Sequence, residues 1–167
     1  MFQLIGAGND TTRNTLAGGV KALLEHPAEL ARLCANPDLI VSACDEMLRW
    51  TSPVLSFLRT TTRDFELAGT LIRAGDTVGI FYPSANRDER VFRDPYRFDI
   101  GRTPNDHLSF GYGAHFCLGT NLARAELAGA LKALLPLLPH LQLADGAQRI
   151  AHSHVTGYSK LPVRWVA

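Results

Sequence analysis

The sequence has 167 residues, of which 46% are hydrophobic and 20% charged, and its net charge is +1. This is an ordinary globular composition, and a domain of this length buries roughly 70% of its unfolded surface. The scattered basic residues and near-neutral charge give no reason to expect a nucleic acid or a membrane surface as partner. The apolar stretch from Leu122 to Leu143 is interrupted by charges and prolines, so it predicts no membrane span.

The first third of the chain predicts three helices. Apolar residues at helical spacing predict a helix over residues 1–25, which a His-Pro pair closes. Pro27 suits the first position of a second helix over residues 27–35. A third helix is expected to start at Pro37 and to end before Pro53.

The middle of the chain changes character. Its β-branched and aromatic residues predict short strands at 55–62, 65–67 and 77–81. Turns are expected at Ala68-Gly69 and Ala74-Gly75. Residues 83–109 show little periodicity, and long irregular segments in compact proteins are usually functional.

The last third predicts a helix and a hairpin. Leucines at mostly helical spacing predict a helix from about residue 118 to 135, and Pro136 stops it. Residues 152–166 predict a hairpin around Gly157.

The three cysteines cannot all pair with one another. Cys34 and Cys44 lie in apolar, helical stretches and are expected to be buried small hydrophobic residues. The residues after Met1 show neither the basic region nor the cleavage site of a signal peptide. These features together indicate a reduced, cytoplasmic protein.

The third cysteine, Cys117, lies in a glycine-rich run directly ahead of a predicted helix. Gly111 and Gly119 supply backbone freedom and allow a flat ligand to approach closely. Free N–H groups and the positive dipole end of the helix lower the pKa of a thiol there. The pattern therefore predicts a stabilised thiolate, which acts as a nucleophile or as a metal ligand.

Three other interpretations of Cys117 are open from the residues alone. A buried structural cysteine is the commonest case, but the glycine-rich loop disfavours it. A catalytic nucleophile needs a histidine base, and His115, two residues away in a loop, cannot make a triad by itself. Zinc is disfavoured because no second cysteine or histidine pair has ligand spacing.

A polar patch interrupts the first predicted helix between Ala7 and Thr12. Gly8 costs that helix about 0.5–1 kcal/mol relative to alanine, but a ligand can lie against it. The hydroxyl of Thr11, next to Asp10, can bond to the carbonyl one turn earlier and bend the helix. The alternative is an amphipathic helix with a polar face.

Two further patterns are weak signals on their own. Glu46 and Arg49 lie three residues apart on one face of the third predicted helix, where they can pair. Arg97 lies between Tyr96 and Phe98 in a turn-forming segment, where a solvated arginine is the simplest interpretation.

In this order along the chain, the four patterns resemble the cytochrome P-450 family. The run from Phe110 to Gly119 matches the family's haem-binding loop, Phe-x-x-Gly-x-x-x-Cys-x-Gly, with Cys117 as the iron ligand. Residues 7–12 resemble its long oxygen-activating helix. Two other segments, 85–88 and 160–165, are similar to bacterial members.

The resemblance extends to a structural network. Glu46 and Arg49 match the family's Glu-x-x-Arg motif, and Arg97 resembles the third member of its Glu-Arg-Arg triad. These residues are expected to lock the irregular segment against the third helix, and a buried network of this kind is costly to break.

The resemblance implies a mainly α fold with a small β-sheet, the C-terminal part of the P-450 fold. Family members are far longer, so residues 1–167 are expected to be the C-terminal haem-thiolate portion of a domain whose N-terminal half is absent. Such a chain alone is expected to bind haem weakly or not at all.

The implied activity is mono-oxygenation of a small apolar organic substrate by a haem-thiolate enzyme. The cofactor is haem b, and the thiolate of this family favours O–O cleavage. Asp10 and Thr11 resemble the acid–alcohol pair that delivers protons during oxygen activation. Arg59 and His115 occupy positions that bind haem propionates in similar proteins. Further cofactor contacts are expected from Gly8, Phe110, Gly111 and Gly119.

The resemblance also implies a redox partner. Electrons are expected from NAD(P)H through a ferredoxin or a flavodoxin. Two alternatives from other classes are a truncated or inactive haem-binding protein without turnover, and an enzyme that uses Cys117 as a nucleophile.

Overall fold

A computed structural model describes residues 2–166, with side chains described from Gly6 to Val166. Its helices are α1 (Phe2–Glu25), α2 (Pro27–Ala35), α3 (Ile40–Thr51), α4 (Tyr82–Ala85) and α5 (Thr120–Leu134). Short 3₁₀ turns are η1 (Pro37–Leu39), η2 (Gly113–His115) and η3 (Leu138–His140). In these described residues no helix is long and apolar enough to cross a membrane.

The boundaries predicted for the first three helices are confirmed, with a refinement at the third. Pro27 is the first residue of α2, where its missing N–H costs nothing. The third helical stretch begins as the 3₁₀ turn η1 and becomes α-helical at Ile40. Ser52, with φ of 43°, ends α3 one residue before Pro53.

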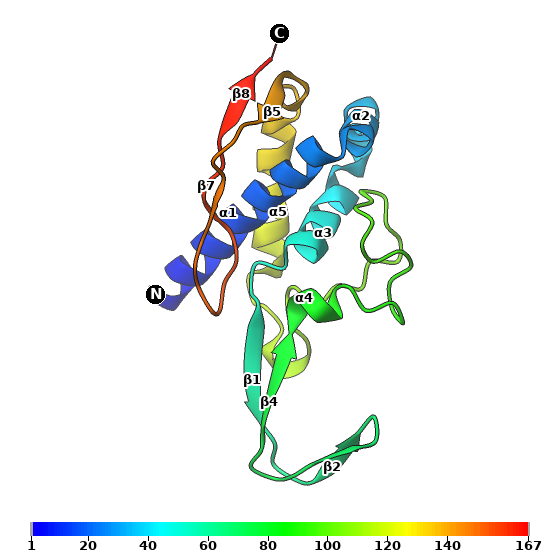
Figure 1. Cartoon of the computed structure of the whole chain (residues 1–167), viewed down its shortest axis with the longest axis vertical. Helices are drawn as coiled ribbons and strands as arrows, with labels where there is room; N and C mark the ends of the chain where they lie inside the picture. The colour runs from blue at the N-terminus through cyan, green and yellow to red at the C-terminus, as the bar shows by residue number, and fades with distance from the viewer. Residues whose placement is uncertain (1, 167) are drawn as a thin grey trace.

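The core lies where α1, α3 and α5 cross one another (Figure 1). Leu23, Met47 and Leu127 are fully buried there, one from each helix. Burial of each such side chain contributes about 1.5–3 kcal/mol. Two glycines of α1 allow the close approach to α3, because a methyl group at Gly19 would overlap Met47 and one at Gly18 would crowd Thr51.

The middle strands form two antiparallel ladders. They are β1 (Ser56–Thr60) with β4 (Thr77–Phe81), and β2 (Phe65–Leu67) with β3 (Thr70–Ile72). Ala68 and Gly69 both have positive φ, as a tight hairpin turn requires. Figure 1 shows the β1–β4 ladder extending away from the helices toward β2. The predicted turn at Ala68-Gly69 is confirmed, whereas β3 was not predicted.

The predicted hairpin over residues 152–166 is wrong in its pairing. The final strands, β7 (Tyr158–Lys160) and β8 (Val163–Trp165), pair with the earlier β6 (Gln148–Arg149) and β5 (Leu141–Leu143), respectively. The two ladders form one ribbon that lies along α1 (Figure 1). Gly157 is needed for close packing, because a side chain there would overlap Asn14 of α1.

The irregular stretch predicted over residues 83–109 is largely confirmed. It begins with the short helix α4, which was not predicted, and then runs without regular structure to η2. Phe98 and Ile100 anchor it in the core, with exposed fractions of 1% and 0%.

Candidate functional site

The loop that carries Cys117 is closed by its own backbone. The N–H of Cys117 donates to the carbonyl of Phe110 across 2.9 Å, and that of Phe116 donates to Gly113 across 3.0 Å. Gly111 and Gly113 both have φ of 73°, a conformation that strains other residues. The glycines of the motif are therefore required by the fold of the loop itself.

Cys117 lies directly ahead of α5. Gly119 is the N-cap residue, and the helix begins at Thr120, two residues later than predicted. The Thr120 hydroxyl donates to the carbonyl of Cys117 across 2.7 Å and ties the loop to the helix. The Cys117 thiol is exposed.

The other two cysteines have different environments. Cys44 is buried in the core, as predicted, and desolvation, with a smaller contribution from Asp45, raises its pKa to about 12. Cys34 is half-buried and only packs against the core, so its predicted full burial is wrong. Cys117 is thus the exposed thiol among the three.

The Glu46–Arg49 pair of α3 is fully buried. Two guanidinium nitrogens of Arg49 donate to the two carboxylate oxygens of Glu46, across 2.7 and 2.8 Å. Arg49 also donates to three backbone carbonyls of the long irregular segment, those of Asn86, Pro95 and Arg97. The pair therefore fastens this segment to α3, and both side chains have 0% exposure.

The third charged member of this network is Arg102, and the prediction of Arg97 is wrong. The Arg97 side chain is exposed, and the residue contributes only its carbonyl. Arg102 Nε donates to Glu46 Oε2 across 3.2 Å, and its side chain is 8% exposed. A turn closed by the Arg97 N–H on the Asp94 carbonyl leaves the Arg97 side chain at the surface. A second turn, closed by the Arg102 N–H on the Asp99 carbonyl, follows the buried Phe98 and Ile100 and precedes the Arg102 side chain that reaches Glu46.

Asn86 was not predicted as a site residue, yet it joins α3 to the start of the Cys117 loop. Its amide nitrogen donates to the hydroxyls of Ser52 and Ser109, across 2.8 and 3.0 Å. Its amide oxygen accepts the N–H of Leu108 across 2.7 Å. The two serines in turn donate to carbonyls in the last turn of α3: Ser109 to that of Leu48, which also accepts the Ser52 N–H, and Ser52 to that of Arg49.

The polar patch of α1 is exposed. The Thr11 hydroxyl donates to the carbonyl of Ala7 across 2.7 Å, and Asp10 pairs with Arg13 at 3.0 Å. A Cβ on Gly8 would meet no atom within 4 Å, so a ligand has room there. The described contacts do not join Asp10 or Thr11 to the Cys117 loop.

Arg59 and His115 are also exposed. Arg59, in β1, donates to the carbonyl of Leu58 and lies 5.8 Å from the ring centre of Phe57. His115 lies in η2, within the Cys117 loop. No contact in the described part of the chain joins the two side chains, so their common role as anion ligands stays a prediction.

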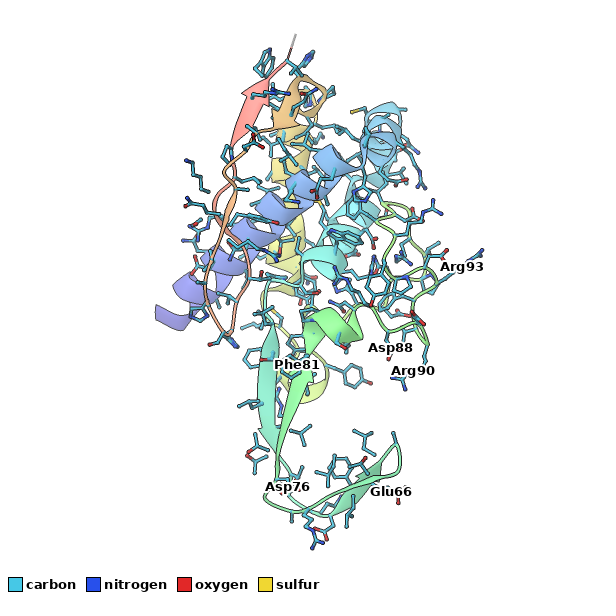
Figure 2. All side chains as sticks on the ribbon, viewed as in Figure 1. Glu66, Asp76, Phe81, Asp88, Arg90 and Arg93 are labelled. Atoms are coloured by element: carbon cyan, nitrogen blue, oxygen red, sulfur yellow. The ribbon has the colours of Figure 1, made fainter. Side chains whose placement is uncertain are left out.

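A groove of about 920 Å³ lies elsewhere. Its lining includes Trp50, Arg87 and Arg149, together with Asp88 and Arg90, which Figure 2 labels. None of its lining residues belongs to the Cys117 loop. The Cys117 thiol itself is exposed.

A family model described as Cytochrome P450 matches residues 1–138. This chain belongs to the cytochrome P450 family. Among curated relatives, a steroid C26-monooxygenase from Mycolicibacterium smegmatis is 51% identical over 144 residues, which are 86% of this chain and 36% of the relative. A methyl-branched lipid omega-hydroxylase from Mycobacterium tuberculosis is 46% identical over 164 residues, 97% of this chain and 38% of the relative.

Solved P450 structures superpose closely. The cytochrome P450 PksS of the Bacillus subtilis bacillaene polyketide synthase has a TM-score of 0.93 and 42% identity, over 99% of this chain and 44% of that one. P450BioI, solved with an acyl carrier protein that carries hexadec-9Z-enoic acid, has a TM-score of 0.91 and 42% identity, over 95% of this chain and 42% of that one. The predicted mainly α fold class is confirmed, and this P450 chain spans less than half the length of these relatives.

The surroundings of Cys117 in this P450 fit a haem. The thiol is exposed, and Gly119 lies beside it, since a Cβ built on Gly119 would be 3.8 Å from the sulfur, an ordinary contact distance. Large apolar side chains around it are also exposed, at 87% for Tyr112, 52% for Phe116 and 92% for Leu118. A flat, largely apolar group that accepts a thiolate ligand matches this donor and this surface.

Proposed function

We propose that this chain, residues 1–167, is the C-terminal haem-binding portion of a haem-thiolate monooxygenase with haem b as cofactor. The observation that carries the proposal is the exposed Cys117 thiol, held ahead of α5 by the Phe110 carbonyl and the Thr120 hydroxyl. When bound, haem supplies the iron that activates dioxygen, so that one oxygen atom enters the substrate and the other leaves as water.

The residues of the Cys117 loop have distinct roles in this proposal. Cys117 would ligate the iron, and Phe110, Gly111 and Gly119 would contribute further contacts to the haem from the same loop. The guanidinium of Arg59 and the imidazole of His115, both exposed, would bind the propionates. Gly8 of α1, where a Cβ would meet no atom within 4 Å, would leave room for the cofactor.

Asp10 and Thr11 are proposed to supply protons. The Thr11 hydroxyl donates to Ala7 and can accept a proton in turn, while the Asp10 carboxylate exchanges protons with water on the exposed face of α1. The back-bonding of Thr11 to the helix carbonyl holds its oxygen in one position.

The substrate is proposed to be a small apolar organic molecule. The names of two relatives specify a methyl-branched lipid and a steroid, and both are apolar. Electrons are proposed to come from NAD(P)H through a ferredoxin or a flavodoxin. A cytoplasmic location is supported by the three free cysteines.

Replacing Cys117 with alanine tests the iron ligand. We expect a haem-loaded, reduced chimera, in which this chain replaces the matched segment of PksS and the haem site is covered, to give a strongly red-shifted Soret band with carbon monoxide. Cys117→Ala should abolish this band, and Cys34→Ala should leave it intact. A red-shifted band that persists in the chimera with Cys117→Ala would contradict the proposal.

Replacing Thr11 with alanine tests the proton supply. In a chimera with the steroid C26-monooxygenase, we expect more electrons to be consumed per product formed, because the hydroxyl that relays the proton is gone. Loss of one general acid–base group typically lowers product formation by about 10²-fold or more. The matched control is Thr12→Ala, on the next position of α1, and equal coupling in the two variants would remove the role of Thr11.

A further inference from the structure

Asp45 joins α3 to α5 immediately beside the buried network. Arg124 Nε of α5 donates to Asp45 Oδ1 across 2.8 Å. His107 Nε2 approaches the same oxygen at 3.5 Å, a long contact that is weaker than the arginine bond. Desolvation tends to raise the pKa of Asp45, but hydrogen bonds from His107 and Arg124 outweigh it and lower the pKa. The carboxylate is therefore held charged between the two side chains.

The same two side chains flank the ring of Phe110. The Arg124 guanidinium carbon lies 5.0 Å from the ring centre, within cation–π range, and the His107 ring centre lies 5.7 Å away. His107 Nδ1 accepts the N–H of Ser109, so Nε2 carries the proton that faces Asp45. Phe110 is thus held on two sides by groups that share one carboxylate.

Phe110 connects this cluster to Cys117. Its carbonyl accepts the Cys117 N–H, and its ring lies 6.3 Å from that of Phe116. Movement of the Phe110 ring would therefore move the carbonyl that closes the loop. The path from carboxylate to thiol passes through Arg124, Phe110 and one backbone hydrogen bond.

Helix packing does not need this ion pair. The α3–α5 contact already contains Met47, Leu127 and Leu131, all with 0% exposure. The Asp45 and Arg124 side chains are 27% and 39% exposed, so the pair lies at the edge of that interface. The packing of α3 against α5 does not explain why the arginine of this pair lies over the ring of Phe110.

We propose that Asp45 is a positioning residue for the Cys117 loop: it fixes Arg124 over Phe110 and so keeps the Phe110 carbonyl in place for the Cys117 N–H. The consequence for haem rests on the proposed function. The positioning itself is a property of this chain without any ligand.

Hydrogen exchange of the ligand-free chain tests the positioning. We expect Asp45→Asn and Arg124→Gln each to speed exchange in residues 110–119 by roughly fivefold, the size expected from a partly exposed pair with a cation–π contact. The double variant should exchange no faster than either single variant, and Asp45→Glu should restore slow exchange. The exchange rates of amides in the α3–α5 core should not change. If the pair only stabilised the packing of the two helices, those rates would rise as well.

The control variant is Asp88→Asn, because Asp88 also pairs with an arginine, Arg90, but their described hydrogen bonds include none to residues 110–119. Additive effects of the two single variants, or equal acceleration in the loop and the helix core, would overturn the proposal. In haem-loaded protein, Asp45→Asn should shift the reduction potential and Asp45→Glu should restore it.

Haem loading separates this inference from the proposed function. If the loop responds to Asp45→Asn but Cys117→Ala does not alter the haem spectrum, the positioning stands and the proposed function fails. If Cys117 ligates haem but the loop exchange and the potential are insensitive to Asp45→Asn, the function stands and the positioning is overturned.

Discussion

Replacing Arg49 with methionine is expected to lower the free energy of unfolding by about 3–5 kcal/mol, because one partner of a buried ion pair is removed. Glu46 would keep its charge at 0% exposure, with Arg102 as its remaining charged partner. Three backbone carbonyls, those of Asn86, Pro95 and Arg97, would also lose a donor. Urea unfolding followed by circular dichroism measures the change.

The chain provides a matched control for Arg49→Met. Arg13 pairs with Asp10 at the same spacing on a helix, but the two side chains are 62% and 57% exposed. Exposed pairs contribute about 0.2–1 kcal/mol, so Arg13→Met should change stability by no more than this. Equal losses in the two variants would mean that burial does not set the strength of the Glu46–Arg49 pair.

The sequence predicts the helices well because their signals are local. Pro27 and Pro53 mark a start and a stop by removing a backbone donor or restricting the residue before them, wherever the chain folds. Strand pairing is harder to predict, because the sequence of a strand indicates which side chains share a face but not which other strand pairs with it. The strands β7 and β8 pair with the earlier strands β6 and β5 and not with each other. Gly157 predicted a turn, but in the structure it leaves room for the side chain of Asn14.

In the candidate site, too, local features could be predicted from the sequence and long-range contacts could not. The Cys117 loop is a local motif, in which Gly111 and Gly113 have positive φ and the cysteine precedes a helix within a few residues. Arg102 reaches Glu46 across 56 positions of sequence, and spacing along the chain carries no information about such a contact. Two turns, closed by the N–H groups of Arg97 and Arg102 on the carbonyls of Asp94 and Asp99, decide which arginine faces Glu46, and the sequence pattern does not predict them.

Replacing Asn86 with leucine is expected to lower the free energy of unfolding by about 3 kcal/mol, since a buried donor or acceptor left unpaired costs about 1–3 kcal/mol. Asn86 has 0% exposure, and its amide bonds to Ser52, Ser109 and the N–H of Leu108. Leucine has a similar size, so the loss reflects the hydrogen bonds and not a cavity. Asn121→Leu, at an exposed position in the first turn of α5, is the control and should be nearly neutral.

The loss of stability in Asn86→Leu should be larger in the Cys117 loop than in the rest of the chain. Ser109 immediately precedes Phe110, and its hydroxyl holds the Leu48 carbonyl at the end of α3. Without the Asn86 amide, the start of the Cys117 loop keeps the bond from Ser109 to Leu48 but loses the bonds of Ser109 and Leu108 to Asn86, while the core of α1, α3 and α5 keeps its packing. Amide exchange in residues 108–117 should therefore rise more than global unfolding accounts for, and a uniform rise would mean that Asn86 stabilises the whole chain without ordering the loop.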